Sequence, residues 1–142
     1  MIVRSYRDLR VWQRSLDLVQ AVYAITRRLP REERYALGDQ LRRSVGSVAA
    51  NIAEGHTRAH RKEFLQFLAV AQASLTEVET HLIIVERVGY LEPAPVGGAL
   101  GICGEVGRML SVMRARLRDA SPDSRQSPTL ASPQTPAAPL PD

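Results

Sequence analysis

Residues 64–85 read FLQFLAVAQASLTEVETHLIIV, and more of the fold follows from this stretch than from any other. Its apolar residues recur in alternating steps of four and three through three heptads: Phe64, Leu68, Ala71, Leu75, Val78, Leu82 and Val85. This period lines one face of an α-helix and does not fit a strand. Gly89 is a stop signal, so the pattern predicts a helix of about 28 residues ending there.

Two stretches on the N-terminal side repeat this pattern. Residues from about 8 to 29 carry an apolar line that predicts a core face: Leu9, Trp12, Leu16, Val19, Tyr23 and Thr26. A second apolar line (Val11, Leu18 and Ile25) lies beside it. A further helix is predicted from Leu37, Leu41, Val45, Val48 and Ile52, with Gly55 as its natural stop.

A fourth helical pattern follows Pro93 and Pro95, and its apolar positions are Val96, Leu100, Cys103, Val106, Leu110, Met113 and Leu117. Five glycines weaken the first half of this helix, because each costs about 1 kcal/mol relative to Ala. No useful strand alternation occurs, and short connections force neighbouring helices to run antiparallel. The sequence therefore predicts an all-α protein, an antiparallel up-down-up-down four-helix bundle.

The C-terminal end differs in composition from the rest of the chain. From Ser121 it reads SPDSRQSPTLASPQTPAAPLPD, with Leu130 and Leu140 as its large apolar residues. Such a segment cannot bury enough surface to offset its ordering entropy. We therefore predict a bundle domain over residues 1–119 and a disordered, dispensable Pro/Ser-rich tail over residues 120–142.

Charge and cysteine content limit the classes of protein to which the chain can belong. The net charge is +4, and it is uneven: residues 1–62 carry 13 basic and 6 acidic groups, whereas residues 63–119 carry 5 and 7. One part of the surface should therefore be positive. A lone cysteine, the lack of a signal-peptide pattern and the lack of an apolar run of membrane-spanning length predict a cytoplasmic protein with no membrane role.

Three stretches together resemble the four-helix-bundle family first noticed as reading frames within intervening sequences of bacterial 23S ribosomal RNA genes. They are YRDLRVWQRSLDLVQAVYAITRRLP (6–30), RYALGDQLRRSVGSVAANIAEGHTR (34–58) and KEFLQFLAVAQASLTEVETHL (62–82). The NIAEG string with its upstream Gln-Leu-Arg-Arg is the most specific part. The resemblance implies a bundle that assembles into a ring, a pentamer in the branch that serves as accessory protein to the reverse transcriptase of retroelements.

Basic residues supply the candidate nucleic-acid-binding surface, namely Arg7, Arg10, Arg14, Arg58, Arg61 and Lys62. Arg7, Arg10 and Arg14 share one helical face by their spacing, and the other three flank the turn between the second and third helices. A stripe of this kind would bind RNA or DNA phosphates by charge and would lose affinity with salt. A solvated basic face is the alternative interpretation.

A polar cluster in the second helix comprises Gln40, Arg42, Arg43, Asn51 and Glu54, with Asp39 beside it. One hypothesis is that its arginines bind phosphate or a partner's carboxylate. The other, which we favour, is structural: Arg43, Ser47, Asn51 and Glu54 follow helical steps and would form an internal polar ladder against the third helix.

Catalytic patterns are missing from the sequence. No Glu-x-x-His motif, nucleophile motif or phosphate-binding glycine loop occurs, which predicts no enzyme activity, metal, cofactor or small-molecule substrate. Apolar residues beyond one core (Val11, Leu18, Ile25, Phe67, Val70, Ile83 and Ile84) predict a homo-oligomer. We therefore expect an oligomeric interaction protein that binds nucleic acid, with a structural protein–protein adaptor as the alternative.

Overall fold

The computed structural model describes residues 2–120 of the chain. It contains four long helices: α1 (Arg10–Arg27), α2 (Leu37–Thr57), α3 (Arg61–Val88) and α4 (Pro93–Asp119). Two short 3-10 turns, η1 (Tyr6–Asp8) and η2 (Arg31–Glu33), precede α1 and α2. The predicted disordered tail lies outside the described residues, apart from Ala120.

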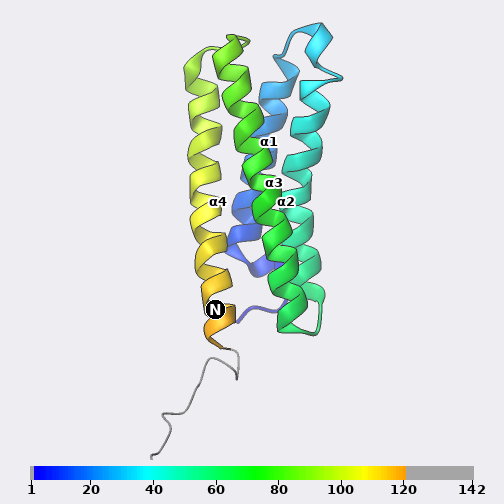
Figure 1. Ribbon diagram of the computed structural model, residues 1–142, viewed down its shortest axis with the longest axis vertical. Helices are drawn as coiled ribbons and strands as arrows, with labels where there is room; N and C mark the ends of the chain where they lie inside the picture. Colours follow the sequence, from blue (N-terminus) through cyan, green and yellow to red (C-terminus); the bar gives the residue numbers. More distant parts are fainter. Residues whose placement is uncertain (1, 121–142) are drawn as a thin grey trace, which may run out of the picture.

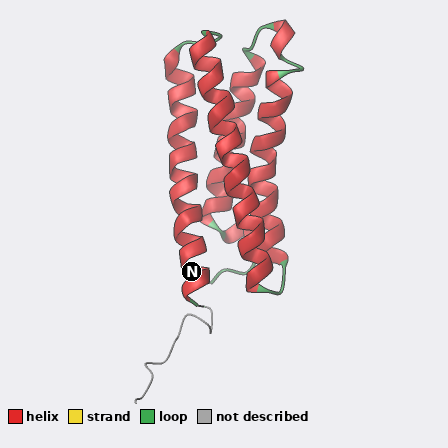
Figure 2. Ribbon diagram, in the orientation of Figure 1, coloured by secondary structure: helices red, strands yellow, loops and turns green. Residues whose placement is uncertain are grey.

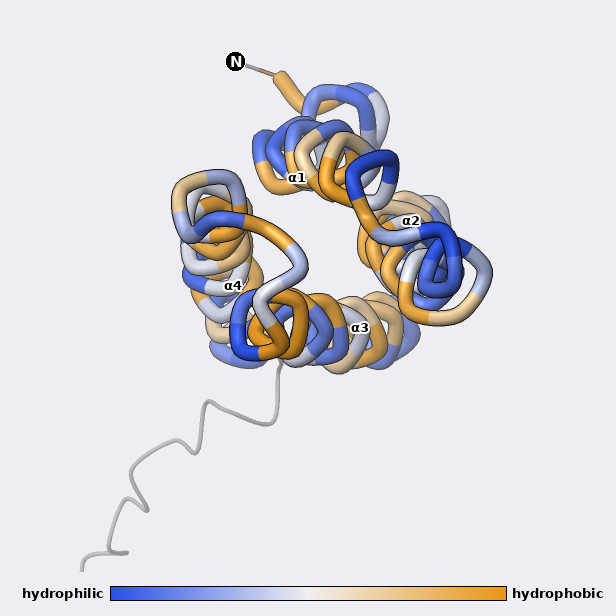
Figure 3. Tube along the Cα trace, turned by 90° about the horizontal axis from the view of Figure 1, so that it is seen from above, coloured by the Kyte–Doolittle hydropathy of each residue, from blue (hydrophilic) through white to orange (hydrophobic). Residues whose placement is uncertain are grey.

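The four helices alternate in direction along one long axis (Figure 1). Viewed end-on they stand at the corners of a square, so that each helix contacts the two that flank it in the order α1, α2, α3, α4 (Figure 3). Within residues 2–120 all regular structure is helical (Figure 2). The predicted all-α, up-down-up-down four-helix bundle is confirmed.

All four helices contribute to the core, and the lines of apolar residues predicted for α2 and α3 are buried in it. Leu41, Val45, Val48 and Ile52 of α2 are fully buried, as are Leu68, Val78, Leu82 and Val85 of α3.

Gly89 ends α3 in the left-handed region at φ 82°, where a side chain would be strained. By length and composition α3 and α4 are apolar enough to cross a membrane, and in the bundle each turns one face to this core.

The prediction for the core face of α1 was only partly correct: Thr26 is buried, and Leu9, Trp12 and Val19 pack partly buried against the core. Leu16 and Tyr23 are each 37% exposed, whereas Val11, Leu18 and Ile25 from the second apolar line are buried. The buried line includes Ser15, which periodicity skipped because it is polar. Its hydroxyl donates to the Trp12 carbonyl at 2.6 Å, so the group is satisfied within its own helix and is tolerated in the core.

Gly55 was predicted to end the second helix, and that prediction was wrong. α2 continues to Thr57, and Gly55 lies buried inside its last turns. A Cβ at this position would stand 2.6 Å from Cβ of Phe67 and 2.9 Å from Cδ2 of Phe64. The glycine therefore permits the close approach of α2 to α3 beside the turn that joins them.

Two substitutions in α2 test this role. Gly55→Ala should destabilise the fold by about 1–3 kcal/mol, because Phe67 of α3 must move away to make room. Gly46→Ala, in the same helix, should stabilise the fold by about 0.5–1 kcal/mol, since nothing lies within 4 Å of its Cβ position. Urea unfolding followed by circular dichroism measures both, and equal effects of the two variants would contradict the packing role.

Candidate functional site

The topology brings separate basic segments to one end of the bundle, which we call the basic end. It comprises Arg4 and Arg7 before α1, Arg58, Arg61 and Lys62 around the α2–α3 turn, and Arg116 and Arg118 at the end of α4. All seven residues are exposed. Figure 1 shows why they gather: the start of α1, the α2–α3 turn and the end of α4 lie at the same end of the bundle.

Two acidic groups near the basic end, Asp8 and Glu54, are held by local contacts. Asp8 accepts hydrogen bonds from the backbone N–H groups of Arg4 at 2.8 Å and Ser5 at 3.2 Å, and these bonds lower its pKa. Glu54 pairs with Arg58 at 3.3 Å. Arg61 and Lys62 have no ion-pair partner among residues 2–120.

Two arginines of the basic end also lie over aromatic rings. The guanidinium carbon of Arg58 is 5.1 Å from the centre of the Phe67 ring, and that of Arg7 is 5.8 Å from the centre of the Tyr6 ring. Such contacts hold the planar groups in place and leave N–H donors for a phosphate.

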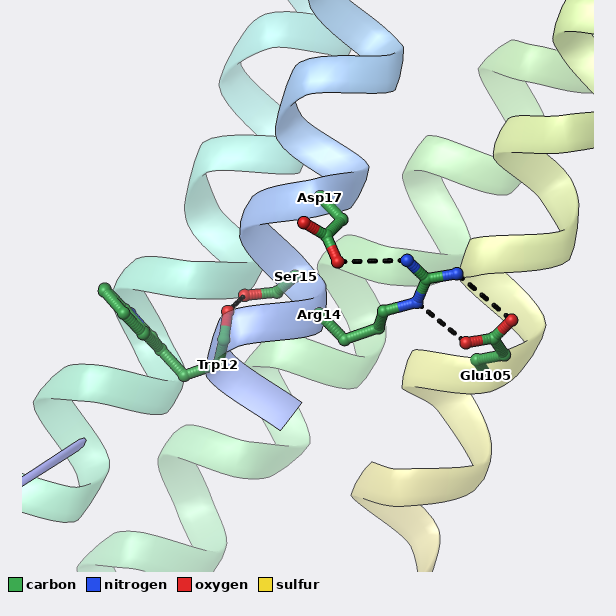
Figure 4. A network of polar contacts seen from close by, with 5 residues as sticks. All are labelled: Trp12, Arg14, Ser15, Asp17 and Glu105. Atoms are coloured by element: carbon green, nitrogen blue, oxygen red, sulfur yellow. Dashed lines mark hydrogen bonds and ion pairs between the residues drawn. The ribbon is translucent and has the colours of Figure 1, made fainter. Parts of the chain in front are cut away.

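Arg14 was predicted in the same stripe, but the structure gives it another role. Its guanidinium donates to both carboxylate oxygens of Glu105 on α4, at 2.7 and 3.2 Å, and to Asp17 at 3.0 Å (Figure 4). These bonds raise the pKa of Arg14 and lower that of Glu105. With its charge held by two carboxylates, Arg14 joins α1 to α4 instead of facing a ligand.

Arg10 belongs to a third place, apart from the Arg14 pair and from the α2–α3 turn. It is exposed and lines a groove between α1 and the last turns of α4. The predicted continuous stripe of Arg7, Arg10 and Arg14 is therefore interrupted. Arg7 is set apart because the chain leaves the α1 axis at Leu9, which has extended backbone angles, and Arg14 differs from Arg10 because its charge is taken up by Glu105 and Asp17.

The predicted polar cluster also separates into parts. Arg42 hydrogen-bonds Asp39 and donates to the Arg34 carbonyl at 2.6 Å, so it fastens the connection between α1 and α2. Asn51 donates to the Ser47 carbonyl at 2.8 Å and to its hydroxyl at 2.9 Å. The Ser47 hydroxyl is 2.9 Å from that of Ser74 on α3, which links the two helices. Glu54 is exposed and not part of this network.

A polar groove of about 560 Å³ lies beside this network, between α2 and α3. Gln40, Arg43 and Ser47 line it from α2, and Ser74 and Glu77 line it from α3. Arg43 is exposed at its edge and lies outside the interior ladder that we predicted for it. The α3 residues Ser74 and Glu77 were missed, because only the register of α3 against α2 brings them here.

Two features bear on nucleophilic and metal chemistry within residues 2–120: the state of the Cys103 thiol and the placement of metal-ligating side chains. Cys103 is buried, and desolvation with a smaller contribution from Glu79 raises the pKa of its thiol to about 12, so it stays protonated at neutral pH. No three His, Cys, Asp or Glu side chains within this part of the chain gather as a metal ion would require.

The arrangement defines an antiparallel four-helix-bundle protein with one basic end. The chain belongs to the 23S rRNA-intervening sequence protein family, whose model matches residues 7–112. Its fold is similar to the crystal structure of a protein with unknown function from the S23 ribosomal protein family of Bacteroides thetaiotaomicron, with a TM-score of 0.69. The identity is 22%, over 73% of this chain and 97% of that one, which supports the fold alone. Comparison with curated proteins gives no match.

The Arg14–Glu105 pair predicts a pH-dependent contribution to stability. The pKa of Glu105 is lower in the folded state than in the unfolded state, so the pair contributes its full stabilisation above the ordinary glutamate pKa and loses it as pH falls through the lowered pKa of the folded state. Glu105→Gln should therefore lower the melting temperature at about pH 7, and the difference from the wild type should disappear in acid, once the pH is below the lowered pKa of Glu105.

Glu86→Gln is the matched control, since Glu86 is an exposed glutamate without an ion pair in the described part of the chain. If the difference in melting temperature between Glu105→Gln and the wild type persists unchanged in acid, the charge of the Glu105 carboxylate is not what stabilises the bundle.

Proposed function

We propose that this protein is a non-enzymatic, oligomeric nucleic-acid-binding protein that holds RNA or DNA phosphates at its basic end. The observation that carries the proposal is the convergence of cations from three parts of the chain on one end of the bundle. Phosphate binding needs several cations within reach of one backbone and no particular catalytic geometry.

The opposite end of the bundle supports the assignment by contrast. Its cations are more often engaged: Arg28 pairs with Glu92 at 2.6 Å, and Arg42 pairs with Asp39. Glu33 is nearby and accepts a hydrogen bond from the Tyr90 hydroxyl at 3.2 Å. With charges of both signs interspersed, this end offers a polyanion a weaker site.

Self-association is the second part of the proposal. Val11, Leu18 and Ile25 no longer support it, because they are core residues. α3 nevertheless keeps an exposed strip whose apolar residues are Val70, Ile84 and Val88, at 49%, 40% and 57% exposed, with Glu77 between the first two. A second copy packed on this strip would remove it from water. A ring of copies would bring several basic ends to one nucleic acid, and a reverse transcriptase is the protein partner that the resemblance implies.

The basic end predicts a salt-dependent affinity. Fluorescence anisotropy with labelled duplex DNA should give a linear fall of log affinity with log salt from about 50 mM upward. Arg7→Gln/Arg61→Gln/Lys62→Gln should flatten the slope by about 0.9 for each phosphate that the variant no longer neutralises. The matched control is Arg27→Gln/Arg31→Gln/Arg87→Gln, which removes three exposed cations at the opposite end. Equal effects of both variants, or no binding of duplex DNA and structured RNA at about 50 mM salt, would refute the assignment.

The exposed strip on α3 predicts assembly. Sedimentation equilibrium at micromolar concentration should give a mass that is a multiple of 15.7 kDa, a pentamer by resemblance to the family. Val70→Ser/Ile84→Ser should shift it toward the monomer because two of the three exposed apolar residues of the strip are lost, whereas Leu16→Ser on α1 should not. A wild-type monomer would rule out the oligomer, and the salt experiment would still decide nucleic-acid binding.

A further inference from the structure

A second groove, of about 500 Å³, runs between the start of α1 and the last turns of α4, and we call it the α1–α4 groove. Its floor is apolar: Val11 comes from α1, and Met109, Met113 and Leu117 come from α4. Val112 at its edge is 50% exposed. The three α4 floor residues are only partly covered by the rest of the chain, so apolar surface remains open to solvent here.

The groove exists because α4 is longer than the α1 segment that faces it. The Arg14–Glu105 pair sets the register of these antiparallel helices, and in that register positions 2–6 of a continued α1 would cover Met113 and Leu117. The chain instead turns aside at Leu9, and η1 packs against α2. Ile2 and Val3 are exposed, so they leave the α4 residues uncovered.

Three arginines border the groove: Arg10 on α1, with Arg108 and Arg116 on α4. None of them has an ion-pair partner among residues 2–120. The acidic residue Glu105, one turn before Arg108 on α4, is already bonded to Arg14 and interacts with Arg108 only through longer-range attraction. The groove therefore combines an apolar floor with an uncompensated positive border.

We propose that the α1–α4 groove is a docking site for an acidic amphipathic helix of a partner protein. A helix of about two to three turns laid along α4 would replace the missing continuation of α1. Its apolar face would cover Met109, Met113 and Leu117, and flexible methionines adapt to varied side chains. Its Asp or Glu residues would meet the three bordering arginines, which accounts for both the shape and the charge of the groove.

This occupant fits better than nucleic acid. A phosphate backbone would satisfy the arginines but would leave the apolar floor in contact with a hydrated polyanion, at no gain from burial. Arg116 belongs to both sites, but the other cations of the basic end do not surround an apolar floor, so the groove differs from it in chemistry. Substitutions at Arg7, Arg61 and Lys62 should therefore affect the basic end alone, and substitutions at Arg10 and Arg108 should affect the groove alone.

The experiment uses the full chain and two fluorescein-labelled peptides of about 16 residues, designed with Leu at helical spacing. One carries Glu on both flanks of the Leu stripe, and the other carries Lys at the same positions. Anisotropy should show binding of the Glu peptide only. Arg10→Gln/Arg108→Gln/Arg116→Gln should weaken it about tenfold, as expected for three partly exposed charge pairs.

Two further variants probe the apolar part. Leu117→Ser removes a floor residue, and Val112→Asp places a negative charge at a half-exposed position where unfolding is not expected. Both should weaken binding of the Glu peptide, with the helical circular dichroism unchanged. The control Arg27→Gln/Arg31→Gln/Arg87→Gln and the basic-end variant Arg7→Gln/Arg61→Gln/Lys62→Gln should bind it like the wild type.

Several results would overturn the proposal. Equal binding of the Lys peptide would show that charge does not select the ligand. Wild-type binding by Val112→Asp and by the arginine variant would show that the peptide does not bind in the groove. Tighter peptide binding after Leu130→Ser/Leu140→Ser would mean that the chain's own C-terminal segment occupies the groove. A loss of native mass in Val112→Asp on sedimentation would assign the groove to a second copy.

Discussion

Short connections between long helices constrain the rest of this structure. Three residues join α2 to α3, from Arg58 to His60, and four join α3 to α4, from Gly89 to Glu92. Connections of that length leave successive helices no arrangement other than antiparallel packing side by side. Because the directions alternate, segments distant in sequence share an end, and the basic end arises from this alternation rather than from any local run of charge.

The α2–α3 turn illustrates how packing and charge meet at one place. Gly55 lets the backbone of α2 approach Phe64 and Phe67 of α3, which brings the helices together just before the turn. Arg58 then lies over the Phe67 ring and pairs with Glu54, while Arg61 and Lys62 begin α3. A close contact in the apolar interior thus fixes where three cations lie on the surface.

α1 and α4 show the reverse relation, in which a polar contact leaves apolar surface uncovered. The Arg14–Glu105 pair fixes their register, and the departure of the chain at Leu9 then exposes the end of α4. The two candidate surfaces differ in consequence: the basic end is a cluster of exposed cations, whereas the α1–α4 groove is apolar with arginines at its border. A scaffold that holds a nucleic acid with one surface and a protein with the other is consistent with both proposals.

The sequence by itself determined the class of fold, the four helices and the apolar faces of α2 and α3, because heptad spacing and strong stop signals such as Gly89 act within one helix. It also indicated which half of the chain is basic. Only the tertiary structure decided which of the two apolar lines of α1 is buried, since both lines fit the spacing of one helix and the packing of α1 against α2 and α4 selects between them. Ser15 can lie in the buried line because its hydroxyl bonds the Trp12 carbonyl. In the same way, the pairing of Arg14 with Glu105 and the meeting of Ser47 with Ser74 depend on the register between helices, which no spacing along one helix encodes.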